Sequence, residues 1–79
     1  MQTSRGSGSI RSREQFARRL RSARVRSGLS QERLGAVARL HRTEISLLER
    51  GERDPKLSTL FRLADALGVS VAALIEDER

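Results

Sequence analysis

Cysteine, tryptophan and tyrosine are absent from this 79-residue chain, and proline, histidine and methionine occur once each. Without cysteine, the chain forms neither disulfides nor thiolate metal sites. No apolar run approaches the roughly 20 residues of a membrane-spanning helix, and no signal-peptide core is present, so we expect no membrane partner and a cytoplasmic location. Two phenylalanines are the only aromatic residues, which suits one small aliphatic core and a single domain.

The sequence offers little chemistry for catalysis. Its one histidine, His41, has no further ligands nearby at metal-binding spacing, and neither a phosphate loop nor a nucleophile motif is present. We therefore predict that the protein is not an enzyme, that it holds no metal or other cofactor, and that it has no domain for a small-molecule effector.

Positive charge is concentrated in the first two thirds of the chain. Residues 1–53 carry 13 arginines against 5 glutamates, whereas residues 54–79 carry 3 basic and 5 acidic residues. The first part therefore suits a polyanionic partner. A biased genome composition would explain the preference for arginine over lysine, but not this uneven distribution.

Residues 31–50 (QERLGAVARLHRTEISLLER) show the pattern of two short amphipathic helices joined by a tight turn. Ser30 is a good N-cap for the first of these helices. Inward-facing residues then recur at spacings of three and four: Leu34, Val37 and Ala38. Gly35 lies inside this helix, where glycine costs about 1 kcal/mol relative to alanine, so we expect it to make room for a crossing helix.

In the second helix Ile45 and Leu48 face the core, because they lie three residues apart on one side. The opposite side carries residues that can reach a partner: Arg42, Thr43, Ser46, Leu47 and Arg50. His41 begins this helix, and we expect it either to cap the helix or to contact a phosphate. Such a helix pair is typical of DNA-binding helix-turn-helix units, whose second helix enters the major groove.

Several of these side chains suit base reading. Arg42 is the strongest candidate, because its guanidinium fork matches guanine O6 and N7. Thr43 and Leu47 suit the thymine methyl group, and Ser46 suits either a base or the DNA backbone. Glu44 either accepts from cytosine N4 or disfavours wrong sequences by repulsion. The alternative is that all of them form an ordinary solvated surface.

Residues 1–11 mix glycine, serine and arginine without apolar periodicity, so we expect a flexible basic arm ahead of a folded domain of residues 12–79. Such an arm either follows the DNA backbone or minor groove, or has no function of its own. Ser12 and Gln15 match a capping box, which predicts that the first helix begins at Ser12 and runs to Ser27.

That first helix directs an arginine toward the core. Its core-facing residues are Phe16, Leu20, Ala23 and Ser27. Arg24 lies beside them, four residues after Leu20, and Glu49 lies on the buried side of the second helix-turn-helix helix. We predict that Arg24 and Glu49 form an ion pair; the alternative is two separately solvated side chains.

Two further helices follow the helix-turn-helix. Pro55 prevents helix continuation, and Ser58 is placed to cap a fourth helix. The apolar residues at helical spacing there are Leu57, Leu60, Phe61, Ala64 and Leu67. Gly68 ends that helix, and Ser70 caps a short fifth helix. The fifth helix carries three apolar residues: Val71, Leu74 and Ile75. Because one small module makes too few base contacts for useful selectivity, we predict a homodimer joined through them on an inverted-repeat operator; the alternative is that these residues serve only the core of the monomer.

Residues 16–75 resemble the XRE-type, Cro and phage-repressor family of helix-turn-helix transcriptional regulators. The resemblance rests on GLSQ at 28–31, Gly35, Ile45, ISLLERG at 45–51 and DPKLSTLFRLADALGVS at 54–70. The sequence departs from the family at Arg39, where glycine is usual, so we expect either a left-handed backbone or a slightly different turn. LHRT at 40–43 also resembles small controller proteins of restriction–modification systems.

The resemblance implies an all-α, five-helix fold like that of the lambda repressor domain. It also implies the Arg24–Glu49 pair and a set of DNA contacts: bases by Arg42, Thr43 and Leu47, and phosphates by Gln31 and Arg50. The function we predict is that of a sequence-specific, double-stranded-DNA-binding transcriptional regulator, bacterial or phage and associated with the nucleoid. The alternative is an antitoxin-like module that neutralises a partner protein and binds its operator secondarily.

Overall fold

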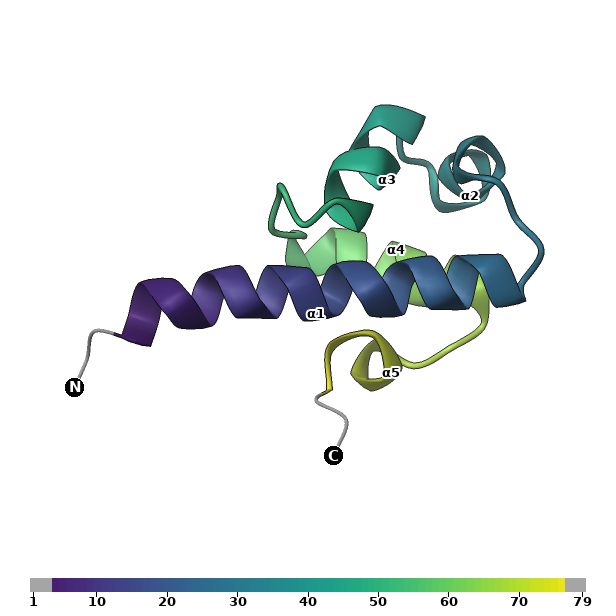
Figure 1. Cartoon of the computed structure of the whole chain (residues 1–79). Helices are drawn as coiled ribbons and strands as arrows, with labels where there is room; N and C mark the ends of the chain where they lie inside the picture. The colour runs from purple at the N-terminus through teal and green to yellow at the C-terminus, as the bar shows by residue number, and fades with distance from the viewer. Residues whose placement is uncertain (1–3, 77–79) are drawn as a thin grey trace.

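Five helices and no strand make up the part of the chain that the structure describes. This computed structural model describes the backbone of residues 4–76 and the side chains of residues 11–76. The helices are α1 (Ser4–Arg26), α2 (Gln31–Ala38), α3 (Arg42–Glu49), α4 (Leu57–Leu67) and α5 (Val71–Ile75). The long α1 crosses the molecule, with α2 and α3 on one side of it and α5 on the other (Figure 1). The predicted all-α, five-helix fold is confirmed.

Helix α1 begins at Ser4 and not at Ser12, as the sequence pattern predicted. Ser12 and Gln15 therefore lie inside the helix, and the predicted capping box is wrong. Once the packed part of α1 has formed, each added residue gains one backbone hydrogen bond, and no proline interrupts the segment. Residues 4–11 belong to α1, so the flexible arm predicted for residues 1–11 is wrong for this stretch. Residues 1–3 lie outside the described residues, and a role in DNA contact for residues 1–11 stays a prediction.

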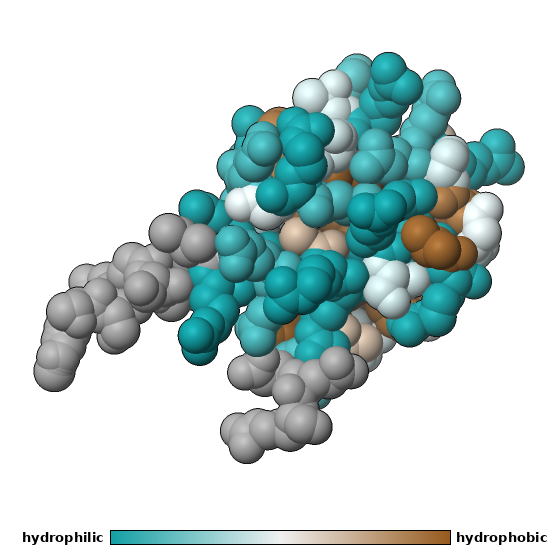
Figure 2. Space-filling view, in the orientation of Figure 1, coloured by the Kyte–Doolittle hydropathy of each residue, from teal (hydrophilic) through white to brown (hydrophobic). Residues whose placement is uncertain are grey.

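The core lies between α1 and the four shorter helices. Its largest fully buried side chains come from all five helices: Leu20, Leu34, Ile45, Leu48, Leu63 and Leu74. Burying an aliphatic side chain of this size contributes about 1.5–3 kcal/mol, so this cluster is the main source of stability. The face of the molecule in Figure 2 is correspondingly mostly hydrophilic.

Two of the predicted inward-facing stripes differ from the structure. In α2, Leu34 and Ala38 are buried but Val37 is exposed. The buried residues of α2, which include Gly35, form an arc around the helix. At about 100° per residue, the centre of this arc lies roughly 110° away from Val37. In α1, Ser27 is exposed because the helix ends one residue before it.

The fourth helix starts earlier and is turned differently from the prediction. It begins at Leu57 with Lys56 as N-cap and without a side-chain cap bond, so Ser58 is not the cap. Its buried residues are Thr59, Leu63, Ala64 and Leu67. Phe61 lies about 160° around the helix from Leu63. Leu57 and Phe61 are consequently 69% and 59% exposed.

Helix α5 is capped by Ser70 as predicted, because the Ser70 hydroxyl accepts from the Ala73 amide at 3.1 Å. Its three apolar residues have different environments. Leu74 is only 1% exposed and belongs to the core, Val71 packs partly against the core, and Ile75 is 51% exposed. Leu74 therefore offers no surface to a partner, and its assignment to a dimer interface is wrong.

The turn between α2 and α3 explains the residues at 35 and 39. A Cβ added to Gly35 would lie 2.5 Å from the Leu40 carbonyl oxygen in the turn and 3.4 Å from the amide nitrogen of Arg42, the first residue of α3, so glycine makes room for both the turn and the start of the next helix. The Leu40 amide in turn donates to the Gly35 carbonyl at 2.8 Å. Arg39 adopts φ 63° and ψ 45°, the left-handed backbone that was one of the two expectations.

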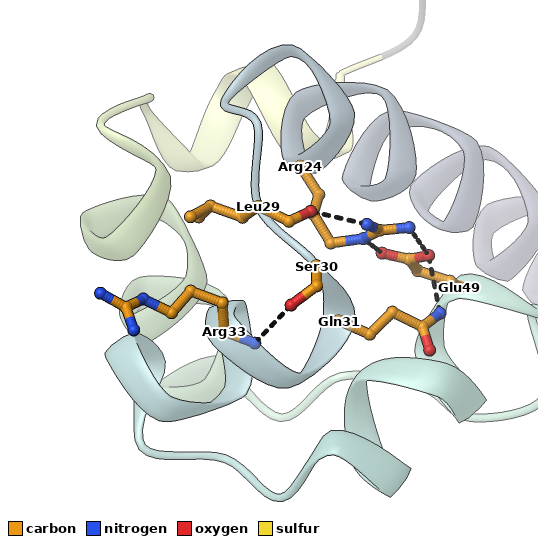
Figure 3. Close-up of polar contacts among 6 residues, drawn as sticks. All are labelled: Arg24, Leu29, Ser30, Gln31, Arg33 and Glu49. Carbon is orange, nitrogen blue, oxygen red and sulfur yellow. Dashed lines mark hydrogen bonds and ion pairs between the residues drawn. The ribbon is translucent and has the colours of Figure 1, made fainter.

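An ion pair inside the protein joins α1 to α3 (Figure 3). Arg24 Nε and Nη2 donate to the two carboxylate oxygens of Glu49 at 2.6 and 3.0 Å. Arg24 Nη1 also donates to the Leu29 carbonyl at 2.8 Å, and Gln31 Nε2 donates to Glu49 Oε1 at 3.1 Å. The Arg24 and Glu49 side chains are only 13% and 4% exposed. The two charges are thus buried together and multiply hydrogen-bonded, as a buried pair requires.

The hydrogen bond from Glu49 raises the pKa of the Arg24 guanidinium above its ordinary value, and the charge of Glu49 adds to this, against the opposing effect of burial. An arginine whose pKa is raised in the folded protein contributes to stability as long as it is charged. This contribution is lost only as the pH rises through the raised pKa. Because arginine already titrates above about 12, Arg24 stays charged throughout the neutral range.

Replacing Gly35 with alanine should destabilise the protein. The new Cβ would push against the Leu40 carbonyl, and overpacking of this kind costs about 1–3 kcal/mol, which exceeds the gain of about 1 kcal/mol in helix propensity. Urea unfolding measures the difference. Ala36→Gly, at the exposed neighbouring position, is the matched control for propensity alone; an increase in stability for Gly35→Ala would contradict the argument.

Glu49→Ala should reduce the free energy of unfolding by about 3–5 kcal/mol, because it leaves the buried Arg24 charge without its carboxylate. The matched control is Glu44→Ala, which removes the partner of the half-exposed Arg53 and leaves that arginine open to water, so it should cost about 0–1 kcal/mol. Urea melts of both variants decide the matter. Equal losses would mean that burial of the Arg24–Glu49 pair has no energetic consequence.

Candidate nucleic-acid interface

Helix α3 is held at its N-terminus by its own cap. His41 precedes the helix in an extended conformation, and its Nδ1 accepts from the Thr43 amide at 3.0 Å. The helix-capping role expected for His41 is therefore present. Ile45 and Leu48 then anchor the helix in the core, as predicted, and Glu49 adds the ion pair to α1.

The N-terminal end of α3 presents two of the predicted base-reading residues to solvent. Arg42 and Thr43 are exposed, whereas Ser46 and Leu47 are half-buried. Among the residues that the structure describes, none forms a hydrogen bond or ion pair with the Arg42 guanidinium. Its five N–H donors are thus available to a ligand, and their planar fork suits a base edge or a phosphate.

Arg50, at the other end of α3, is held by neighbours within the chain. Its Nε and Nη2 donate to the Glu52 carboxylate at 3.2 and 3.3 Å, and its Nη1 donates to the Ser46 hydroxyl. Both charged side chains are about half-exposed. The sequence predicted a DNA-facing role for Ser46 and for Arg50, but not that the two side chains contact each other.

Glu44 is also engaged within the chain. Arg53 Nη1 donates to Glu44 Oε1 at 2.6 Å, with the arginine half-exposed and the carboxylate mostly covered. Sequence reasoning missed Arg53, because it lies in the polar connection after α3, where no periodicity indicates which way a side chain points. The only signal in the sequence for this contact was the nearby acidic residue Glu44 on the recognition helix.

Gln31, predicted to contact a phosphate, is the first residue of α2, where it lies half-buried beside Glu49. Ser30 caps this helix as predicted, since its hydroxyl accepts from the Arg33 amide at 3.0 Å (Figure 3). The remaining amide groups at the start of α2 have no helical partner, and such helix ends attract anions.

In the described part of the chain, no cluster of three or more histidine, aspartate or glutamate residues is arranged to hold a metal ion. No described helix combines the length and the apolar character needed to cross a bilayer.

Comparison with known proteins gives a consistent result. A helix-turn-helix family model matches residues 20–74. The control protein C.SmaI of Serratia marcescens is 48% identical over 63 residues, which cover 80% of this chain and 75% of that protein. The immunity repressor protein of Bacillus phage phi105 is 37% identical over 60 residues, covering 76% of this chain and 42% of the repressor.

Solved structures agree with these relatives. The restriction-modification controller protein C.AhdI from Aeromonas hydrophila superposes with a TM-score of 0.78 at 36% identity, covering 80% of this chain and 96% of that chain. A hypothetical transcription factor, NHTF, from Neisseria superposes with a TM-score of 0.78 at 38% identity, covering 81% and 74%. The expected lambda-repressor-like fold is thus confirmed.

The family match extends from α1 into α5 and covers more than half of the chain. The relatives named above are control proteins, a repressor and a transcription factor, so the antitoxin alternative is not supported. Their origin in bacteria and a bacterial phage fits the expected source. The chain therefore belongs to the XRE-type helix-turn-helix family: it is a transcriptional regulator that binds double-stranded DNA, and not an enzyme.

Proposed function

We propose that this protein regulates restriction–modification genes by binding an inverted-repeat operator as a homodimer, with α3 of each protomer in the major groove. The observation that carries the proposal is the exposed N-terminal end of α3, where Arg42 has no hydrogen-bond or ion-pair partner among the described residues. The inner face of the same helix is fixed in the core. The controller role rests on similarity to C.SmaI and C.AhdI, of which this chain covers 75% and 96%.

In this proposal Arg42 reads a guanine through O6 and N7, and Thr43 contacts a thymine methyl group beside it. Leu47 and Ser46 lie one turn further along α3 and contact the next bases or the backbone. The exposure of Arg42 and Thr43 supports these roles most directly, since both side chains reach solvent without rearrangement.

Phosphate contacts are assigned to both ends of the helix-turn-helix. Gln31 and the free amides at the start of α2 hold one phosphate, while Arg50 contacts another. His41 already uses Nδ1 for its cap, so its second ring nitrogen is the atom left for a phosphate. Residues 1–11 would add sequence-independent contacts as a basic arm.

Dimerisation would use exposed apolar residues at the start of α4 and the end of α5. Ile75 lines a small cavity of about 190 Å³ together with Pro55 and Phe16. Leu57, two residues after Pro55, and Phe61, one turn further, are both more than half-exposed. The proposed contact is isologous and runs through Ile75, Leu57 and Phe61. To match one turn of DNA, it would have to place the two recognition helices about 34 Å apart.

Selection of bound duplexes from a random pool at moderate salt tests the proposed function. A palindromic motif with two half-sites about one helical turn apart is expected. A pool that yields no motif would contradict sequence-specific recognition. A selected motif without two-fold symmetry would contradict the dimer but not DNA reading.

Arg42→Ala should lose about 1–3 kcal/mol at one base position of the selected motif and relax the preference there. Arg50→Ala, the matched control at the other end of the helix, should weaken binding to the operator and lower its salt slope by about 1, but leave the base preferred at each position of the motif unchanged. Repeating the selection with both variants separates the two roles. An unchanged motif for Arg42→Ala would remove it from the base-reading residues.

Ile75→Glu and Leu57→Glu should each weaken the dimer, because a charge would be buried at an apolar contact. Sedimentation equilibrium, with and without operator duplex, measures the change in stoichiometry. Val25→Glu is the matched control, since Val25 is similarly exposed but lies on α1. If all three variants remain as dimeric as the parent protein, the contact lies elsewhere.

A further inference from the structure

The outward face of α3 is bordered on both sides by an arginine held by a carboxylate. Around the helix, Glu44 and Ser46 lie about 100° to either side of the buried Ile45. On one flank Arg53 binds Glu44 at 2.6 Å. On the other flank Arg50, bound to Ser46, also binds Glu52 at 3.2 Å. Thr43 and Leu47 lie on the outward arc between these two ion pairs, and Arg42 lies next to the Ser46 flank, about 60° around the helix from Ile45.

Arg42 differs from these two flanking arginines. Its guanidinium has no hydrogen bond or ion pair within the described residues, whereas Arg50 and Arg53 each have a carboxylate partner. Arg50 and Arg53 are half-exposed, so a phosphate can reach them, but in competition with a carboxylate that binds two nitrogens of Arg50 and one nitrogen of Arg53. The positive charge that these two arginines could offer to a phosphate is thus partly neutralised by their carboxylates before DNA binds.

We propose that Glu44 and Glu52 are specificity-determining residues, which occupy the flanking arginines as internal substitutes for DNA phosphates. A duplex gains the full charge of Arg53 and Arg50 by displacing these carboxylates. The inference rests on the proposed function, because it assumes that this face of α3 meets DNA.

The effect falls mainly on sequence-independent binding. Non-specific affinity comes almost entirely from phosphate contacts and counterion release. Two arginines that stay bound to carboxylates therefore lower the affinity for a random duplex directly. On the operator, base contacts by Arg42 and Thr43 supply free energy that a random duplex does not, and this helps to displace the carboxylates. Glu44 and Glu52 therefore increase the ratio of operator affinity to random-duplex affinity.

The test compares Glu44→Gln and Glu52→Gln with the parent protein, using the selected operator and a random duplex of the same length. Fluorescence anisotropy gives dissociation constants over a series of salt concentrations. Each variant should bind the random duplex about two- to five-fold more tightly, the change expected from releasing one exposed ion pair. The salt slope should steepen by about one for each freed arginine. Affinity for the operator should change less.

Removing any acidic charge near DNA also favours binding, so a matched control is needed. Asp65→Asn makes the same charge change on α4, outside the helix-turn-helix, where Asp65 is exposed and forms no ion pair with the described residues. It should tighten random binding less than the two test variants and leave the slope unchanged. In the Arg53→Gln background, Glu44→Gln should give no gain, because the arginine it would release is absent.

Two results would overturn the inference. One is an equal gain for Asp65→Asn; the other is a gain for Glu44→Gln that persists without Arg53. Either would reduce the effect to net charge. Failure of the proposed function gives a different pattern, since the parent protein itself would then not prefer any duplex in the selection. Circular dichroism of every variant verifies that these exposed substitutions leave the helices intact.

Discussion

The orientation of the recognition helix depends on one buried ion pair. Glu49 is the last residue of α3, and its two carboxylate oxygens bind the Arg24 guanidinium of α1 while one of them also accepts from Gln31 of α2. Three helices thus meet at a single carboxylate. Hydrophobic contacts by Ile45 and Leu48 are non-directional, whereas these charge-assisted hydrogen bonds fix rotation and register. An eight-residue helix that would be marginal alone therefore has a defined position.

Most of the fold and the centre of the site could be predicted from the sequence because they depend on local rules. The caps Ser30 and Ser70 and the core residues Ile45 and Leu48 follow from side-chain chemistry and helical periodicity. The Arg24–Glu49 pair could be inferred because two charged residues lay on faces that had to be buried. The resemblance to XRE-type regulators supplied the order of the helices, which periodicity alone does not give.

The remaining features depend on contacts between segments. Val37, Leu57 and Phe61 are apolar at suitable spacings but exposed, since the rotation of each helix is set by its neighbours and not by its own stripe. Arg53 was missed because a loop carries no periodic signal. Gly35 was recognised as special, yet its contact with the Leu40 carbonyl follows from the path of the turn, which the residue types do not specify.

The separation of the two faces of α3 has a consequence for the evolution of such regulators. Residues that fix the helix, such as Ile45 and Glu49, point inward, while Arg42 and Thr43 on the other side make no contribution to the core. Under the proposed function, substitutions on the outer face therefore alter the preferred operator at almost no thermodynamic penalty to folding. A gene duplicated or transferred to a new host can acquire a new target site by a few such changes while its scaffold stays the same.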